Sequence, residues 1–278
     1  MSDQVASAPQ STAVSDGPRP RRLGAVNWLG LWTLYKKEVR RFLKVSFQTV
    51  LAPVATTLLY MIVFSLAIGS RRGEVMGVDF TAFVAPGLIM LGMLNNSFAN
   101  SSSSLIVAKV QGNTVDFLMP PLSAAELAAA FIGGAVTRGV IVGTATALAV
   151  APFVDITISH IWAMAYFGLS ATAMMAMIGL IAGLWAEKFD HLAVITNFII
   201  MPLAFLSGTF YSVEILPEPF YSIRHVNPVF FLIDGFRYGF IGSHDSPLLI
   251  GGLVIAAINA ALLAASYLLL RSGWRLKS

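Results

Sequence analysis

Long uncharged apolar stretches alternate with short polar segments along the 278-residue chain. Crossing the hydrocarbon core of a bilayer as a helix takes about 20 consecutive apolar residues, and each stretch is long enough. Their recurrence therefore predicts an all-α integral membrane protein with six transmembrane helices. The stretches are Val45–Ser70, Phe80–Ala108, Leu127–Val154 (interrupted only by Arg138), Ile161–Ala186, Leu192–Val213 and Ser246–Leu270.

A different pattern precedes the first stretch. Apolar side chains recur there every three or four residues, and basic side chains occupy the opposite side, as in helices that lie along a membrane surface. We therefore predict an amphipathic interface helix at residues 27–44, although a surface helix packed on a soluble partner would show the same pattern. The apolar positions are Trp28, Leu31, Trp32, Tyr35, Val39, Phe42 and Leu43, and the basic ones are Lys36, Lys37, Arg40, Arg41 and Lys44.

The composition agrees with a membrane protein. Charged residues make up 12% of the chain and the mean hydropathy is +0.76, whereas soluble domains carry about 25% charged residues. The chain has no cysteine, which excludes disulfides and thiolate metal sites. Its four histidines are scattered, so no metal site is expected.

Basic residues are distributed unevenly between the two sides that six spans would create. Most of the 18 Lys and Arg residues precede the first span, follow the last span, or lie in the second and fourth connections. Because Lys and Arg accumulate on the cytoplasmic side, we predict that both termini are cytoplasmic. Residues 1–26 are small, polar and proline-containing, and predict a disordered cytoplasmic tail. The interface helix and a six-span domain at 45–275 would follow.

Polar residues interrupt two of the apolar spans. The second span contains a run of Asn and Ser residues from Asn95 to Ser104, and the third contains Arg138. Such groups cannot face lipid without losing hydrogen bonds, and intramembrane cations mark functional sites by default. Asn95, Asn96 and Asn100 are candidates for a substrate path, with helix packing as the competing interpretation. For Arg138 a direct and a structural role both remain open, and the sequence names no partner carboxylate.

Prolines and glycines inside the spans predict local geometry. A proline removes one backbone donor and kinks a helix, whereas small residues at four-residue spacing let helices pack closely in lipid. The kinks are predicted at Pro53 and Pro86, and the close contacts at Gly139 with Gly143 and at Gly179 with Gly183.

The connection before the last span, Val213–Ser246, is long and rich in aromatic residues. Aromatic rings are enriched at membrane interfaces, so we predict short re-entrant helices that dip into the outer leaflet. An aromatic lid that closes the bundle is the alternative. The aromatic positions are Phe220, Tyr221, Phe230, Phe231, Phe236, Tyr238 and Phe240.

Several kinds of chemistry are missing from the sequence. No lysine follows a glycine, so the chain has no GK[ST] phosphate loop. No catalytic triad is suggested, and no acidic residue is predicted at mid-span, where ion-coupled transporters usually need one. We therefore expect the chain not to be an enzyme, and any transport would draw its energy from elsewhere.

The order and spacing of several motifs resemble the membrane subunit of type-2 ABC exporters over about residues 28 to 275. The motifs include "LYKKEVRRFLK", "FVAPGLIMLGMLNNSFAN", "GNTVDFLMPPLSAAEL" and "HVNPVFFLIDGFRYGF". The resemblance implies a bacterial inner-membrane permease that pairs with a second copy and binds two separate ABC ATPase subunits. ATP and magnesium would be held by those partners, no cofactor by this chain, and no nucleic-acid partner is implied.

The resemblance also implies a coupling segment between the second and third spans, at about Gly112–Ser123. Its two prolines would stiffen it, and Asn113 and Asp116 would cap short helical turns. The implied ATPase-coupling residues, at an exposed turn, are Asp116, Phe117, Leu118, Pro120 and Pro121.

Together these features favour the permease subunit of an ATP-driven exporter, which forms the translocation path and couples to cytoplasmic ATPases. One alternative is a non-transporting membrane anchor or regulator of a cytoplasmic ATPase. Another is an ion-coupled secondary transporter, which the missing mid-span carboxylates disfavour. The apolar spans favour a hydrophobic or amphipathic drug, lipid or glycan as cargo without identifying it.

Overall fold

The computed structural model describes residues 24–64, 66, 74–154, 158–212 and 227–275, and most of them are helical. Two short strands, β1 (Glu74–Val75) and β2 (Val78–Asp79), form a hairpin between the first two spans. The helices are α1 (Trp28–Leu43), η1 (Phe47–Leu51), α2 (Ala52–Phe64), α4 (Phe80–Val110), α5 (Val115–Leu118), α6 (Ala124–Val150), α7 (Ile161–Trp185), α8 (Phe189–Ile195), η3 (Thr196–Ile200), α9 (Met201–Leu206), α11 (Pro228–Ile241) and α12 (Leu248–Ser272).

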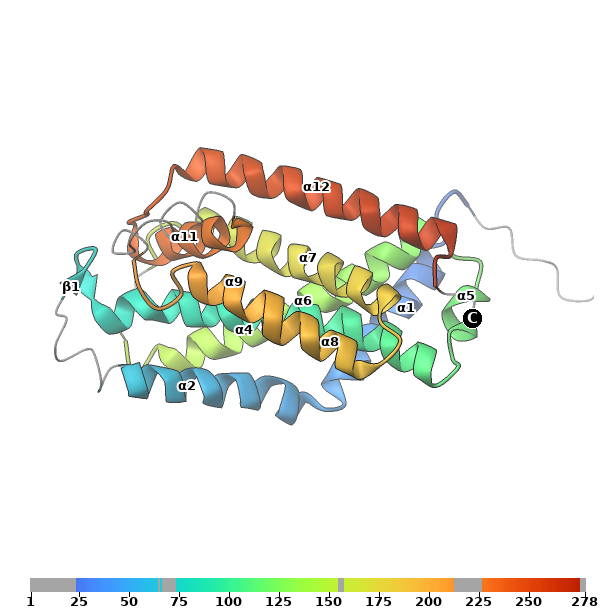
Figure 1. Ribbon diagram of the computed structural model, residues 1–278, viewed down its shortest axis with the longest axis horizontal. Helices are drawn as coiled ribbons and strands as arrows, with labels where there is room; N and C mark the ends of the chain where they lie inside the picture. Colours follow the sequence, from blue (N-terminus) through green and yellow to red (C-terminus); the bar gives the residue numbers. More distant parts are fainter. Residues whose placement is uncertain (1–23, 65, 67–73, 155–157, 213–226, 276–278) are drawn as a thin grey trace, which may run out of the picture.

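Within the described residues, six helical segments are long and apolar enough to cross a membrane, which confirms the predicted all-α membrane architecture. They run roughly along the long axis of the molecule (Figure 1). The β-hairpin and α11 lie at one end, here called the hairpin end, and α5 and the last described residues lie at the other, the α5 end (Figure 1). The spans are Phe47–Phe64, Phe80–Val110, Ala124–Val150, Ile161–Trp185, Phe189–Leu206 and Leu248–Ser272.

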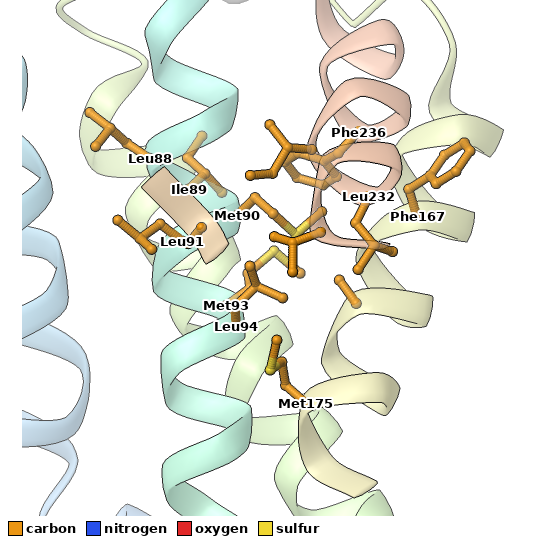
Figure 2. Close-up of a cluster of buried hydrophobic side chains, with 14 of the residues drawn as sticks. Leu88, Ile89, Met90, Leu91, Met93, Leu94, Phe167, Met175, Leu232 and Phe236 are labelled. Atoms are coloured by element: carbon orange, nitrogen blue, oxygen red, sulfur yellow. The ribbon is translucent and has the colours of Figure 1, made fainter. Parts of the chain in front are cut away.

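The second and fourth spans, α4 and α7, form the centre of the bundle. In their most apolar windows 78% and 72% of the residues are buried. Figure 2 shows Met90 and Leu94 of α4 in one apolar cluster with Phe167 of α7 and Phe236 of α11. Because these side chains come from three different helices, the cluster fixes how α4, α7 and α11 pack.

Close contacts between the central helices occur where the sequence predicts them. A Cβ atom on Gly179 of α7 would lie 2.5 Å from the carbonyl oxygen of Phe98 in α4, and one on Gly139 of α6 would overlap Ser97. Only glycine lets the helices approach so closely. The contacts are confirmed at Gly139, Gly143, Gly179 and Gly183.

The first, fifth and sixth spans are far less covered. Only 22%, 17% and 11% of their most apolar windows are buried, and Phe47, Phe198 and Leu249 are each at least three-quarters exposed on the single chain. Apolar surface of this extent would face lipid or another protein. A single chain therefore leaves three of its six spans largely unpaired with protein.

A π-helical turn precedes a proline in two spans. Pro53 follows η1 in the first span, and Pro202 follows η3 in the fifth. The proline ring clashes with the preceding turn of a regular helix, and a wider turn relieves that clash. The interruption predicted at Pro53 thus takes the form of a π-helical turn, whereas α4 continues as an α-helix through Pro86.

The hairpin between β1 and β2 is absent from the all-α prediction. Its two turn residues, Met76 and Gly77, both have positive φ angles, 55° and 78°. This conformation is typical of tight two-residue hairpins. The surrounding sequence has only two-residue strands, too short for a period-two pattern to reveal them.

The aromatic segment before the last span is only partly described, because residues 213–226, with Phe220 and Tyr221, lie outside the described ranges. The described part forms α11, which packs on α7, α4 and α12. Its phenylalanines are buried in the core of the chain, as either a protein-covered re-entrant helix or an aromatic lid would require, so the location of α11 relative to the membrane stays a prediction. The buried aromatic side chains are Phe230, Phe231, Phe236 and Phe240.

Candidate functional site

Helix α1 contacts the bundle through an ion pair of a buried glutamate and a half-buried arginine. Glu38 is 1% exposed, and its Oε2 accepts a hydrogen bond from Arg41 Nη2 at 3.1 Å. Its Oε1 accepts from Ser104 Oγ of α4 at 2.8 Å. Arg41 Nη2 also donates to the Asn100 carbonyl oxygen at 2.7 Å. The placement of Arg41 on the outward cationic side of α1 is therefore wrong: its guanidinium is turned toward α4, and its side chain is 31% exposed.

The apolar side of α1 differs from the predicted one in a similar way. The buried residues are Leu34, Glu38 and Phe42, which are four residues apart and share one face. Trp28 and Trp32 instead remain 72% and 57% exposed. Exposed tryptophans beside a basic surface fit a helix at a membrane interface, where such rings are enriched.

The start of α1 is joined to the predicted coupling segment. The backbone N–H of Asn27 donates to Glu126 Oε1 at 2.5 Å, and its side-chain Nδ2 donates to the Pro121 carbonyl oxygen at 3.2 Å. Glu126 also forms a capping box with Ser123 at the start of α6. A single carboxylate thus ties the ends of α1, the coupling segment and α6 together.

The coupling segment itself divides into an exposed side and an anchor. Asp116, Leu118 and Pro121 are exposed, and Pro120 is half-buried. Phe117 is 3% exposed and packs edge-on against Phe131 of α6, with ring centroids 5.5 Å apart. The prediction of an exposed Phe117 is therefore wrong, because the aromatic side chain is drawn into the apolar cluster at the α5 end.

The predicted capping of this segment is also wrong. The N-cap of α5 is Thr114, and no side-chain capping bond is found there within the described residues. The Asn113 side chain donates to Gln111 Oε1 instead. The contacts that hold the segment instead are those of Phe117 and the hydrogen bonds around Glu126.

Lys109 of α4 binds the carbonyl groups at the C-terminal end of α7. Its Nζ donates to the carbonyl oxygens of Gly183, Leu184 and Ala186 at 3.2, 2.6 and 2.6 Å. A cation at a helix C-terminus satisfies carbonyls that have no partner inside the helix. Lys109 therefore holds the end of α7 against α4.

The row of polar residues in α4 serves two purposes. Ser101 Oγ donates to the Ala176 carbonyl oxygen of α7 at 2.7 Å, and Asn100, fully buried, holds Arg41. These two residues pack helices together, as the competing interpretation proposed. Asn95 and Asn96 instead line a cavity.

That cavity, here called the polar groove, has a volume of about 800 Å³ and lies between α4, α6, the end of α1 and the first span. Arg138 lines it from α6, and its Nε and Nη2 donate to Asn96 Oδ1 of α4 at 3.2 and 3.0 Å. Arg41 lines it from α1. The structure thus brings together three of the four sequence candidates, and places Asn100 just behind the groove wall.

A second cavity lies on the other side of α4 and α6. This apolar pocket has a volume of about 590 Å³. Ile89 and Met93 of α4, Val140 and Thr144 of α6 and Phe236 of α11 contribute to its lining. No charged residue lines it within the described part of the chain.

Two buried ionisable residues of α11, Asp234 and Arg237, lie at the hairpin end. Neither was among the candidate site residues of the sequence analysis. Arg237 is 1% exposed, donates to the Gly208 carbonyl oxygen at 2.5 Å and stacks 4.0 Å from the Phe83 ring centroid. Asp234 accepts from the backbone N–H groups of Asp245 and Ser246. Burial lowers the pKa of Arg237 to about 10, which leaves it charged at neutral pH, and burial raises the pKa of Asp234. The contacts assign this group to packing of α11.

Glu38 and Arg237 could have been found from the sequence. Glu38 lies four residues after Leu34 and four before Phe42, on their helical face. Arg237 lies within the apolar run "PVFFLIDGFRYGFI" of α11. A charge on an otherwise apolar face is the signal in both cases.

Comparisons with known proteins identify a family and relatives of this chain. A family model described as ABC-2 type transporter matches residues 30–241. The chain is 36% identical over 255 residues to inner membrane transport permease YadH of Escherichia coli K12, covering 90% of this chain and 98% of the relative. It is 24% identical over 235 residues to nodulation protein J of Rhizobium meliloti strain 1021, covering 84% and 87%.

Proposed function

Because this chain belongs to the ABC-2 type transporter family and is a multi-pass inner-membrane transport permease, we propose that it forms the translocation path of an ATP-driven exporter. Its family implies an ABC ATPase partner. In the proposed complex two copies of this chain bind two ATPase subunits, which hold ATP and magnesium. This chain hydrolyses nothing itself.

One observation above the others supports the proposal that the coupling segment is the contact surface for the ATPase. The coupling segment presents Asp116 and Leu118 on its surface while Phe117 is locked into the apolar cluster beneath. Met119 beside them is 78% exposed. Exposed apolar side chains of this size on a short connection are typical of a contact surface for another protein.

The proposed movement follows from the connections at the α5 end. A displacement of the coupling segment reaches α6 through Phe117 and Phe131, and reaches α1 through Asn27 and Glu126. Both α1 and α6 line the polar groove. Closure of the two ATPases on ATP would thus widen or narrow the groove by shifting packed helices.

The orientation belongs to the same proposal. Exposed cations at the end of α1, among them Lys36, Lys37 and Arg40, support a cytoplasmic location for that end, because Lys and Arg accumulate on the cytoplasmic side. Both termini would then be cytoplasmic, with residues 1–26 as a tail.

The weakly covered spans support pairing of two copies. The first and fifth spans flank the polar groove, which includes Thr56 of the first and Met201 of the fifth. A second copy placed against these spans would cover their apolar faces and enclose the groove as a path between the two chains. A hydrophobic or amphipathic drug, lipid or glycan is the proposed cargo.

The coupling proposal is tested by co-purification of the ATPase with the full-length chain in mild detergent. Asp116→Arg should lose the ATPase, because it reverses a charge on the contact surface. Glu74→Arg is the matched control, since it reverses an exposed charge at the hairpin end. Equal recovery of the ATPase with Asp116→Arg and with the unaltered chain would show that the segment is not the coupling surface.

A further inference from the structure

The polar groove carries more positive charge than nearby carboxylates balance. Arg41 is paired with Glu38. Arg138 has no carboxylate partner within the described residues, and both of its hydrogen bonds go to the single neutral oxygen Asn96 Oδ1. No acidic residue lines the groove in the described part of the chain. One guanidinium therefore remains without a counter-charge.

This charge lies deep in the bundle. Arg138 is 14 residues from the start of α6, and Asn96 is 14 residues from the end of α4. At about 1.5 Å per residue, both lie ~21 Å from the α5 end of their helices. A charge at this depth is costly unless it faces a water-filled cavity or an anion.

The two guanidinium groups are arranged in sequence along α4. Arg138 is held by Asn96, and Arg41 by Asn100, four residues nearer the α5 end. Four residues correspond to a rise of about 6 Å, or one helical turn. An anion leaving Arg41 would therefore reach Arg138 within a short distance.

The groove wall beside the arginines is apolar. Phe42, Leu88 and Leu91 line it together with Pro53 of the first span. Its volume of about 800 Å³ falls in the range of roughly 300–1,000 Å³ typical of small-molecule sites. The groove thus offers cationic groups and an apolar surface to the same molecule.

We propose that the polar groove binds an amphiphile by its anionic headgroup, which Arg138 and Arg41 contact while the apolar wall holds part of the hydrocarbon. The planar guanidinium fork matches the oxygens of a phosphate or carboxylate. The proposal rests on the function proposed above and names the substrate class of its path.

The test measures binding to the full-length chain alone, in nanodiscs of phosphatidylcholine. The probe is phosphatidic acid with a fluorescent acyl chain, and phosphatidylcholine with the same chain is the zwitterionic comparison. Arg138→Gln should weaken binding of the phosphatidic acid probe about tenfold or more, because a hydrogen-bonded ion pair is lost. Arg271→Gln removes an exposed charge at the end of α12 and should leave binding unchanged.

Three results would overturn the proposal: equal binding by Arg138→Gln and the unaltered chain, equal affinity for the two lipid probes, or inorganic phosphate displacing the probe at similar concentration. The last would indicate a free-anion site. If Arg138→Gln fails to fold, Arg138→Lys keeps the charge without the fork and should bind more weakly than the unaltered chain. No ATPase is present in this binding assay. A negative result would therefore leave the proposed ATPase contact unaffected. Failure of the co-purification test would likewise leave the proposed lipid site unaffected.

Discussion

The polar groove and the apolar pocket share two helices and yet differ in chemistry. On one side of α4 lie Asn95 and Asn96, and on the other lie Ile89 and Met93. The cavities are of similar size, about 800 and 590 Å³. The difference shows that volume alone does not identify a site in a membrane protein, because lipid can fill an apolar pocket at no cost in desolvated charge. A cation at mid-depth in a groove is costly, and such a charge therefore indicates a functional site.

The largest expected effect comes from breaking the wall between the two cavities. Gly139→Ala adds a Cβ that would overlap Ser97 and lie 2.7 Å from Thr172 Cγ2. Overpacking of this kind costs about 1–3 kcal/mol, and chemical unfolding in detergent measures it. In the control Gly252→Ala, the new Cβ would meet Tyr166 at an ordinary 3.6 Å. Equal stability of the two variants would mean that α4 and α6 can separate without loss.

A smaller effect concerns the charge balance behind the polar groove. Glu38→Gln keeps an acceptor for Ser104 but removes the counter-charge of Arg41, so the free energy of unfolding should fall by about 1–2 kcal/mol. The matched control is Glu187→Gln, whose partner Arg275 lies in an exposed pair, with side chains 66% and 40% exposed. That change should cost less than about 1 kcal/mol. Equal losses in the two variants would show that the Glu38–Arg41 pair does not anchor α1.

The six spans could be predicted from the sequence because each is identified by a single local property, the length of its apolar run. The boundaries differ by a few residues where caps decide them, as at Ser123, where a capping box starts α6. Arg138 was identifiable as a lone charge in an apolar run. Its partner Asn96 was only one of several polar residues in α4, since the choice depends on the rotation of two helices about each other.

Tertiary contacts explain the predictions that failed. Phe117 follows an aspartate in a short connection, and its contacts with Phe131 and the apolar cluster at the α5 end make it an anchor. Arg41 belongs to a cluster of cations that looks uniform in sequence. Glu38 and Ser104 make it different, and they lie on two separate helices.

The most direct measurement is transport of a phosphate-bearing lipid by the complex of this chain and its ATPase, reconstituted in liposomes. Asn96→Asp would place a carboxylate where an amide oxygen now lies 3.0 Å from Arg138 Nη2. This change neutralises the groove from within and should reduce transport about tenfold or more. Thr144→Val alters the apolar pocket from the same wall and should leave transport within about twofold. Unimpaired transport by Asn96→Asp would contradict an anion-binding groove.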